Sequence, residues 1–223
     1  MTDAHCHVTG GDPGVRELLC GRDFLGVHPW DASGADISSL RDAIAADPAL
    51  GVGEIGLDRL RSREVSDEMR RVFAEQLEIA AELSRPVVLH GAKCWGEVVA
   101  AVKRHVGRIP AFLFHGFSRS WGLLGEIAAI GGFVSVGPAV LNGHAANYRR
   151  AVATIPSELL LVETDRTVEN AAECPKIADV MREVAALRGV SPAELEALTD
   201  ANADKFLSFR RWTASGENGI ISN

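Results

Sequence analysis

The stretch TDAHCHVTG, residues 2 to 10, places Asp3, His5 and His7 at every second position near the start of the chain. Residues two apart in a β-strand project from the same face, so His5 and His7 can both face one interior. Two imidazoles on one face can grip a single metal ion. The stretch therefore predicts a first strand that carries part of a metal site. Asp3, one step further back, is expected to orient a histidine through its free ring nitrogen.

Six more apolar runs follow this strand and are typical of buried strands, and helical patterns separate most of them. The clearest helix is expected from Asp67 to Ser84, where apolar residues recur at helical spacing after the capping residue Ser66. Two more are expected, from Pro175 to Leu187 and after a capping box at residues 191 to 194. The expected strands lie in DFLGVHP, LGVGEIGL, RPVVLHG, AFLFHGF, GFVSVGP and LLLVETD. This alternation predicts a parallel sheet covered by helices.

An open doubly wound sheet and a closed barrel both fit this alternation. No GxGxxG loop follows a strand, so the phosphate-binding signature of a Rossmann-type sheet is missing from the sequence. In a barrel, several strands supply one active site at their C-terminal ends. Nearly every expected strand here ends near a metal-capable side chain, namely His5 and His7, His28, Glu54, His90, His115 or Asp165. The sequence therefore predicts an α/β fold of the TIM-type (β/α) barrel class.

The interval after the first strand is short for a complete barrel. Only residues 8 to 22 lie between the first two expected strands, and DPGVRELL allows one short helix. We therefore expect seven recognisable strands, with one strand–helix unit missing after the first. Such a gap exposes sheet edges, and a dimer is one way to cover them. A chain of 223 residues fits one barrel domain, expected over residues 1–212, followed by a polar tail over residues 213–223.

The net charge and the cysteine content limit the binding surfaces and the cellular compartment that we expect. The net charge of −7 excludes a global basic surface for nucleic acid, although a bound metal can make one cleft locally positive. The four cysteines form no CxxC pair, which indicates reduced thiols. Neither a secretion signal nor an apolar stretch of membrane-spanning length is apparent in the sequence. We therefore expect a cytoplasmic protein that does not enter a membrane.

The order of the motifs resembles that of a known family. DAHCH, GVHPW, GEIGLD, PVVLHG, FHGFS and LLVETD occur in sequence, and TDANADKFL follows at residues 199 to 207. Together, from Asp3 to Phe206, they resemble the TatD-related metal-dependent deoxyribonucleases of the amidohydrolase superfamily. GEIGLD flanked by the histidine strands is the most specific part of this resemblance.

The resemblance implies a centre of two divalent metal ions. Glu54 would bridge the ions, and Asp165 would also accept a proton from the attacking water as general base. His28 would lie near the substrate phosphate rather than on a metal. A mixture of imidazole and carboxylate ligands suits zinc or manganese ions, and the oxygen ligands are also compatible with magnesium. The implied ligands are His5 and His7 with Asp165 for the first ion, Glu54 as the bridge, and His90 and His115 for the second.

Four other side chains accompany these candidates. Lys93 and Arg119 could bind phosphate oxygens, and a solvated helix-start position suits Lys93 equally well. Glu163 shares a strand face with Asp165 but lies deeper, so a structural or orienting role is expected. Asp58 is expected to brace the loop behind Glu54.

Three functions remain open from the sequence. The first is a metal-dependent nuclease that hydrolyses phosphodiester bonds of DNA or RNA, with nucleic acid as its substrate. The second is a small-molecule hydrolase of the same superfamily, cleaving an ester, amide or phosphoester. Its main support is the short loop RTVENAAEC, residues 166 to 174, where members of the family usually have a longer segment. The third is a non-catalytic barrel that binds metal.

Overall fold

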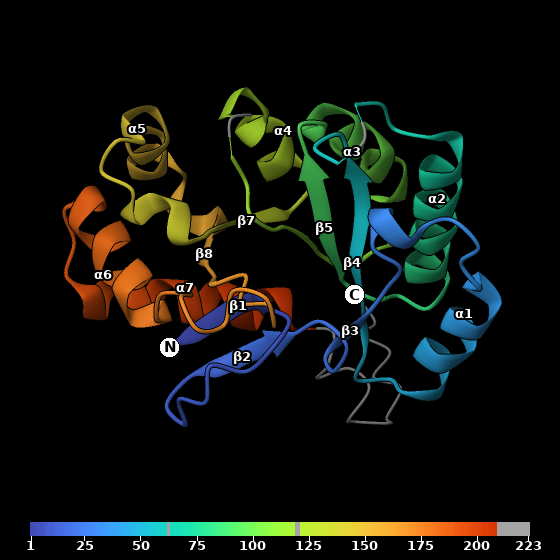
Figure 1. The fold of residues 1–223 in the computed structure, drawn as a ribbon, viewed down its shortest axis with the longest axis horizontal. Helices are drawn as coiled ribbons and strands as arrows, with labels where there is room; N and C mark the ends of the chain where they lie inside the picture. The colour runs from blue at the N-terminus through green and yellow to red at the C-terminus, as the bar shows by residue number, and fades with distance from the viewer. Residues whose placement is uncertain (62, 119–120, 209–223) are drawn as a thin grey trace, which may run out of the picture.

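The computed structural model describes residues 1–61, 63–118 and 121–208, in which helices surround a set of parallel strands (Figure 1). Helices α1 and α2 lie on one side of the strands, and α5 and α6 lie on the opposite side (Figure 1). The strands are β1 (Thr2–Cys6), β2 (Arg16–Leu19), β3 (Phe24–Leu25), β4 (Gly51–Asp58), β5 (Val87–Ala92), β6 (Phe112–Phe114), β7 (Gly132–Val136) and β8 (Leu160–Val162). The α-helices are α1 (Ile37–Ala46), α2 (Asp67–Glu82), α3 (Trp95–Val102), α4 (Leu124–Ala129), α5 (Ala146–Thr154), α6 (Ile177–Arg188) and α7 (Pro192–Phe206).

The strands follow one another around a barrel in their sequence order. Strands β3 to β8 form one parallel six-stranded sheet, and β1 pairs in parallel with β2. Two short backbone contacts join these parts. An isolated bridge links Cys20, directly after β2, to Phe24, and the Asp165 amide donates to the His5 carbonyl over 3.1 Å. The predicted α/β barrel class is confirmed, with a ladder that is interrupted between β2 and β3 and between β8 and β1.

The expected strand count was wrong. The described residues contain eight strands, because Arg16–Leu19 forms β2 instead of the short helix expected in DPGVRELL. Pairing with β1 gives this segment its strand conformation. The Arg16 amide donates to the Met1 carbonyl over 3.0 Å, and the buried Leu18 faces the core. The chain passes from β1 to β2 and on to β3 without an α-helix. Since β2 occupies the expected gap, no second subunit is needed to cover it.

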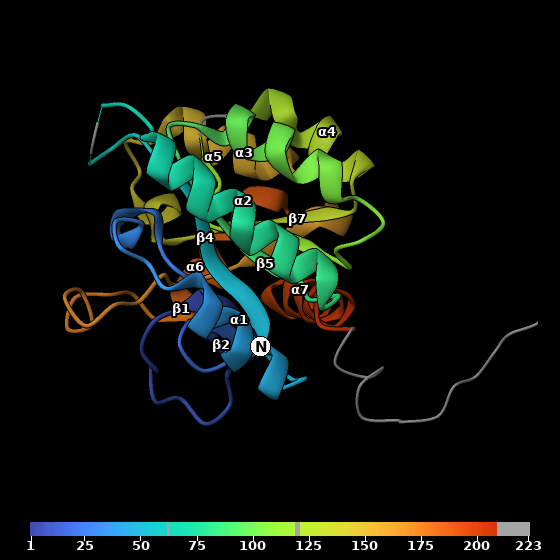
Figure 2. The ribbon, with the colours of Figure 1, turned by 90° about the vertical axis from the view of Figure 1, so that its right-hand side faces the viewer.

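The helices begin and end where local chemistry directs them. The Ser66 hydroxyl accepts from the Met69 amide at the start of α2, and Ser191 forms the complete capping box with Glu194 at the start of α7. Helix α2 packs against β4, and α3 packs against β5. In Figure 2, α2 crosses in front of the strands. Helix α7 packs against both β8 and β1, so it covers the point where the last strand meets the first.

A close approach of two strands positions the centre of the sheet. A Cβ atom at Gly56 in β4 would lie 2.0 Å from the carbonyl oxygen of His90 in β5, so only glycine fits there. This contact lets β4 and β5 run side by side (Figure 1). It also brings Glu54 Oε1 within 2.7 Å of His90 Nδ1. Within the part of the chain that is described, no helix is long and apolar enough to cross a membrane. The expected tail at residues 213–223 lies outside the described residues.

Candidate metal centre

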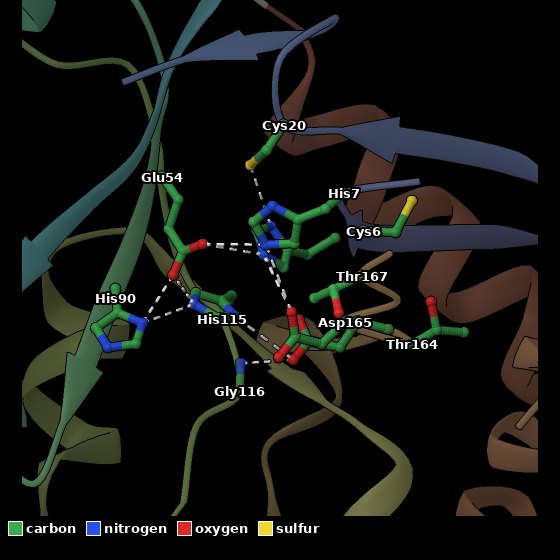
Figure 3. Close-up of polar contacts among 12 residues, drawn as sticks. Cys6, His7, Cys20, Glu54, His90, His115, Gly116, Thr164, Asp165 and Thr167 are labelled. Atoms are coloured by element: carbon green, nitrogen blue, oxygen red, sulfur yellow. Dashed lines mark hydrogen bonds and ion pairs between the residues drawn. The ribbon is translucent and has the colours of Figure 1, made fainter. Parts of the chain in front are cut away.

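Five strands bring the predicted ligands to one end of the barrel. His5 lies in β1 and His7 directly after it, Glu54 lies in β4 and His90 in β5. His115 follows β6, and Asp165 follows β8. In Figure 3, the Glu54 carboxylate lies between His7 on one side and His90 and His115 on the other. The structure therefore brings together all six predicted metal ligands.

Glu54 directs its two oxygens toward different histidines. Its Oε1 lies 2.7 Å from His90 Nδ1 and 2.6 Å from His115 Nε2. Its Oε2 lies 3.3 Å from His7 Nε2 and 3.5 Å from His5 Nε2. One nearly buried carboxylate thus stands between two pairs of imidazoles.

Glu54 and the four imidazoles around it form an array of candidate ligands. Asp165 lies on the β1 side of this array. Its Oδ1 lies 3.6 Å from Nε2 of His5 and 3.6 Å from Nε2 of His7. Its backbone adopts a left-handed conformation with φ 49°, which costs a non-glycine residue energy and is common at functional sites. The Asn170 side-chain amide donates to the Asp165 carbonyl over 3.2 Å and so holds this turn.

His28 lies beside the array and presents a hydrogen-bond donor. The Trp30 amide donates to Nδ1 of His28 over 3.2 Å, so the proton of the neutral ring is on Nε2. That Nε2 atom lies 3.6 Å from Glu54 Oε1. Burial lowers the pKa of His28 to about 4, which keeps the ring neutral near pH 7. A protonated Nε2 favours the predicted role of donating to an anion over that of a metal ligand.

The array holds buried negative charge that requires compensation. Burial alone would raise the pKa of Glu54, but the imidazoles of His115, His5 and His7 hold it well below its usual range. Burial opposes the charged form of His115, yet Glu54 and the buried Glu163 raise its pKa well above the usual value. Burial raises the pKa of Asp165, and the carboxylates of Glu163 and Glu54 add to this against the pull of the imidazoles. A cation in this position would balance the carboxylates.

Side chains behind the array fix its members. Asp58 accepts from His90 Nε2 over 2.8 Å and also from the amides of Leu60 and Arg61. It therefore braces the loop as predicted, and it also orients His90, a role that the sequence did not indicate. Glu163 is buried, accepts from the Gly116 amide and the Ser135 hydroxyl, and lies 3.7 Å from His115 Nδ1.

The role expected for Asp3 was wrong. Its carboxylate accepts from the amide and the hydroxyl of Thr164 and does not contact a histidine ring. Asp3 sits two residues before His5, deep enough in β1 to face β8 rather than the site. The partner at His5 Nδ1 is instead the thiol of Cys20, 3.6 Å away (Figure 3). Nothing in the sequence around Cys20 indicated this contact.

The donor set fits a divalent metal ion. His5 Nε2 is buried and has no hydrogen-bond partner among the described atoms, although it faces both Glu54 and Asp165. An unpartnered buried nitrogen aimed at two carboxylates is the arrangement expected of a metal ligand. Three overlapping groups each gather candidate ligand atoms within 4.8 Å of one another: His5, His7 and Asp165; His5, Cys20 and Glu54; and His28, Glu54 and His90.

Two clefts open onto the array. One, of about 970 Å³, reaches His90, His115 and Asp165 and has Lys93 on its wall. The other, of about 450 Å³, reaches His7, His28 and Glu54. Substrate atoms can therefore approach from either side of Glu54. Lys93 is exposed at the larger cleft, as its candidate role requires, whereas Arg119 lies outside the described residues.

Comparisons with known proteins agree with this architecture. Residues 22–208 match the family model described as TatD related DNase. The chain is 33% identical over 193 residues to the "3'-5' ssDNA/RNA exonuclease TatD" of Cronobacter sakazakii, an alignment that covers 80% of this chain and 73% of the relative. It is 27% identical over 202 residues to the "Uncharacterized metal-dependent hydrolase YcfH" of Escherichia coli K12, covering 84% and 76% of the two chains.

The fold also resembles a solved structure. The crystal structure of the TatD homologue YJJV from Escherichia coli K12 superposes with a TM-score of 0.70. The superposition covers 88% of this chain and 78% of that one at 23% identity, so the likeness is one of fold.

Proposed function

Because the chain belongs to the TatD-related DNase family, we propose that it is a divalent-metal-dependent nuclease that hydrolyses phosphodiester bonds in DNA or RNA. The observation that supports this most directly is Glu54, whose two oxygens face two separate pairs of imidazoles. A carboxylate shared in this way suits two neighbouring cations, and paired cations are typical of enzymes that cleave phosphate esters. The names of the TatD relatives favour single-stranded substrates and attack from the 3′ end.

The ligand assignment follows the two faces of Glu54. His5 and His7 with Asp165 would hold one ion, and His90 and His115 would hold the other, with Glu54 between them. When bound, the ions supply a hydroxide-like water near neutral pH and polarise the phosphate. The mixture of imidazole and carboxylate ligands suits zinc or manganese and admits magnesium.

Two side chains of the site would act on substrate and water. Asp165 would take the proton of the attacking water, a role supported by the position of its carboxylate at the array on the side of the larger cleft. His28 would donate from Nε2 to a phosphate oxygen, a role supported by the Trp30 amide, which keeps the proton on that nitrogen. Because the His28 ring is neutral and carries its proton on Nε2, it can bind the phosphate and does not take a metal ion from the carboxylates.

The first test removes these two groups. Asp165→Asn keeps the shape and an oxygen atom but removes the basic carboxylate, so we expect turnover to fall by about 10²–10⁴-fold. His28→Ala should raise KM for the oligonucleotide with little loss of metal. The assay uses 5′-labelled single-stranded DNA and RNA with manganese, magnesium or zinc, and bound metal is measured in the same preparations.

The same assay separates the alternatives. A wild-type protein that binds metal and hydrolyses a small ester or amide, but no nucleic acid, would replace the nuclease proposal with the small-molecule hydrolase. Full activity of Asp165→Asn with metal retained would remove Asp165 as the base. Loss of metal from that variant would assign it a ligand role only.

We also propose the setting in which this activity operates. The barrel domain extends over residues 1–212, and the tail over 213–223 lies outside it. All four cysteines are free thiols, which supports a reducing compartment such as the cytoplasm. Sedimentation of the purified protein tests whether a dimer forms, for which the filled gap after β1 leaves no structural requirement.

A further inference from the structure

Large apolar side chains are exposed around the mouth of the metal centre. Trp30, Leu60 and Val168 are three of the five such residues in the described ranges. They lie on the loops after β3, β4 and β8, at the same end of the barrel as the ligands. The other two, Val106 and Val190, lie on loops that lead away from helices. Exposed apolar side chains at this end of the barrel can pack against a ligand that has an apolar face.

Trp30 makes a ring contact with a residue of the candidate site. Its ring lies edge-on to that of His28, with centroids 4.6 Å apart, and His28 Nε2 lies 3.6 Å from Glu54 Oε1. Although Trp30 stands this close to the site, 49% of its surface remains exposed. An indole that served only to stabilise the fold would be buried against the core, as Trp95 is.

Cationic side chains accompany this ring. The guanidinium carbon of Arg61 lies 5.1 Å from the centre of the Trp30 ring, and Arg63 follows in the same loop. Arg59, by contrast, is paired with Glu97. Among the described residues, no carboxylate forms an ion pair with Arg61 or Arg63. In a chain of net charge −7, these two cations are therefore available to an external anion.

From this arrangement we propose that Trp30 and Arg61 form a nucleobase-stacking site for single-stranded nucleic acid, beside the metal centre. On binding, Arg61 moves from its position over the Trp30 ring to the backbone phosphate, and the base of a nucleotide adjoining the scissile phosphate stacks on the exposed indole. Stacking accepts every base, so this site gives affinity without sequence preference. The inference rests on the proposed function, because it assigns a subsite to the same substrate.

Binding and cleavage are measured separately so that the two ideas can fail independently. Binding uses fluorescence anisotropy of a 5′-labelled single-stranded oligonucleotide with manganese, in an Asp165→Asn background that preserves the substrate. Adding Trp30→Ala should weaken binding by about 5- to 150-fold, the range that one base–aromatic stack provides. Trp30→Phe should recover most of this, and Val106→Ala, which changes an exposed apolar residue away from the site, should not alter binding.

An oligonucleotide with abasic residues at its 3′ end tests the chemistry of the contact. It retains the phosphates and lacks the bases, so the background protein should bind it as weakly as Trp30→Ala binds the normal oligonucleotide. Trp30→Ala should not distinguish the two oligonucleotides. Equal binding of the normal oligonucleotide by Trp30→Ala and its background, or no binding by the background, overturns the stacking site. Stacking-dependent binding by a wild type that cleaves no nucleic acid overturns the nuclease proposal and leaves the stacking site standing.

Discussion

The carboxylate of Glu54 shows how much a single residue decides in this protein. Its two oxygens divide the histidines into the pair from β1 and the pair from β5 and β6. Each imidazole needs its second nitrogen held in place if the first is to aim correctly. For His90, that support is Asp58, which accepts from Nε2 and leaves Nδ1 facing Glu54.

The Asp58–His90 contact yields a prediction about metal affinity. Asp58→Asn keeps an oxygen for the amides of Leu60 and Arg61, but its amide group can donate to Nε2 and place the ring proton on Nδ1. A protonated Nδ1 cannot bind a metal, so we expect metal affinity to fall about 10–100-fold. Isothermal titration with zinc and manganese measures the loss.

Asp67→Asn is the matched control, since Asp67 is fully exposed at the start of α2 and pairs with Arg70. Its metal affinity should equal that of wild type. An Asp58→Asn protein that binds metal as tightly as wild type would show that the loop, and not His90, is what Asp58 supports.

At this scale the sequence indicated which side chains meet but not what stands behind them. Alternation in β1 and the polar ends of the strands indicated that one site gathers His5, His7, His28, Glu54, His90, His115 and Asp165, which the structure brings together. The family resemblance, not the pattern, separated His28 from the ligands. The contacts of Asp3 with Thr164 and of Cys20 with His5 join distant segments. They depend on register between strands, which a single sequence does not encode locally.

At the scale of elements, local signals and long-range pairing contributed differently. The helices α2, α6 and α7 were predicted within a few residues, because caps and apolar spacing act within a helix. Strand β2 was missed because RELL has no alternating pattern of its own. Its conformation comes from hydrogen bonds with β1, so tertiary pairing overrides local preference.

The capping box of α7 gives the prediction for this scale. Ser191→Ala removes the acceptor for the Glu194 amide, which should cost about 1 kcal/mol of stability. For a domain of this size that corresponds to a fall in Tm of about 2–4 °C by scanning calorimetry. Ser38→Ala, at an exposed position inside α1, should leave Tm nearly unchanged. An unaltered Tm in Ser191→Ala would mean that packing on β1 and β8, and not its cap, sets the stability of α7.

At the scale of the whole molecule, the candidate ligands connect five of the eight strands that the described residues form. A metal bound to them ties β1, β4, β5, β6 and β8 together across the two interruptions of the ladder. The unfolded chain lacks this array, so a metal that binds the folded state must stabilise it.

Metal removal should therefore lower the thermal stability of the whole barrel. At a free metal concentration one hundred times Kd, binding adds about 2.7 kcal/mol. With about 2–4 °C per kcal/mol for this chain length, Tm should rise by roughly 5–11 °C over the chelator-treated protein. Scanning calorimetry with and without zinc, manganese or magnesium measures the shift. Glu54→Gln should reduce it strongly, and equal Tm values with and without each metal in wild type would argue against a metal centre.

The contact between the last strand and the first also bears on how the protein is made. A ribosome releases the chain from its amino end, so β1 emerges before β8 and Asp165. The Asp165 amide, which donates to the His5 carbonyl, is therefore absent when β1 first leaves the ribosome. Helix α7, which covers that junction, emerges later still. Until then the nascent chain carries histidines and a glutamate without the aspartate that completes them. The centre that joins β1 to β8 therefore forms only after all the strands between them have left the ribosome.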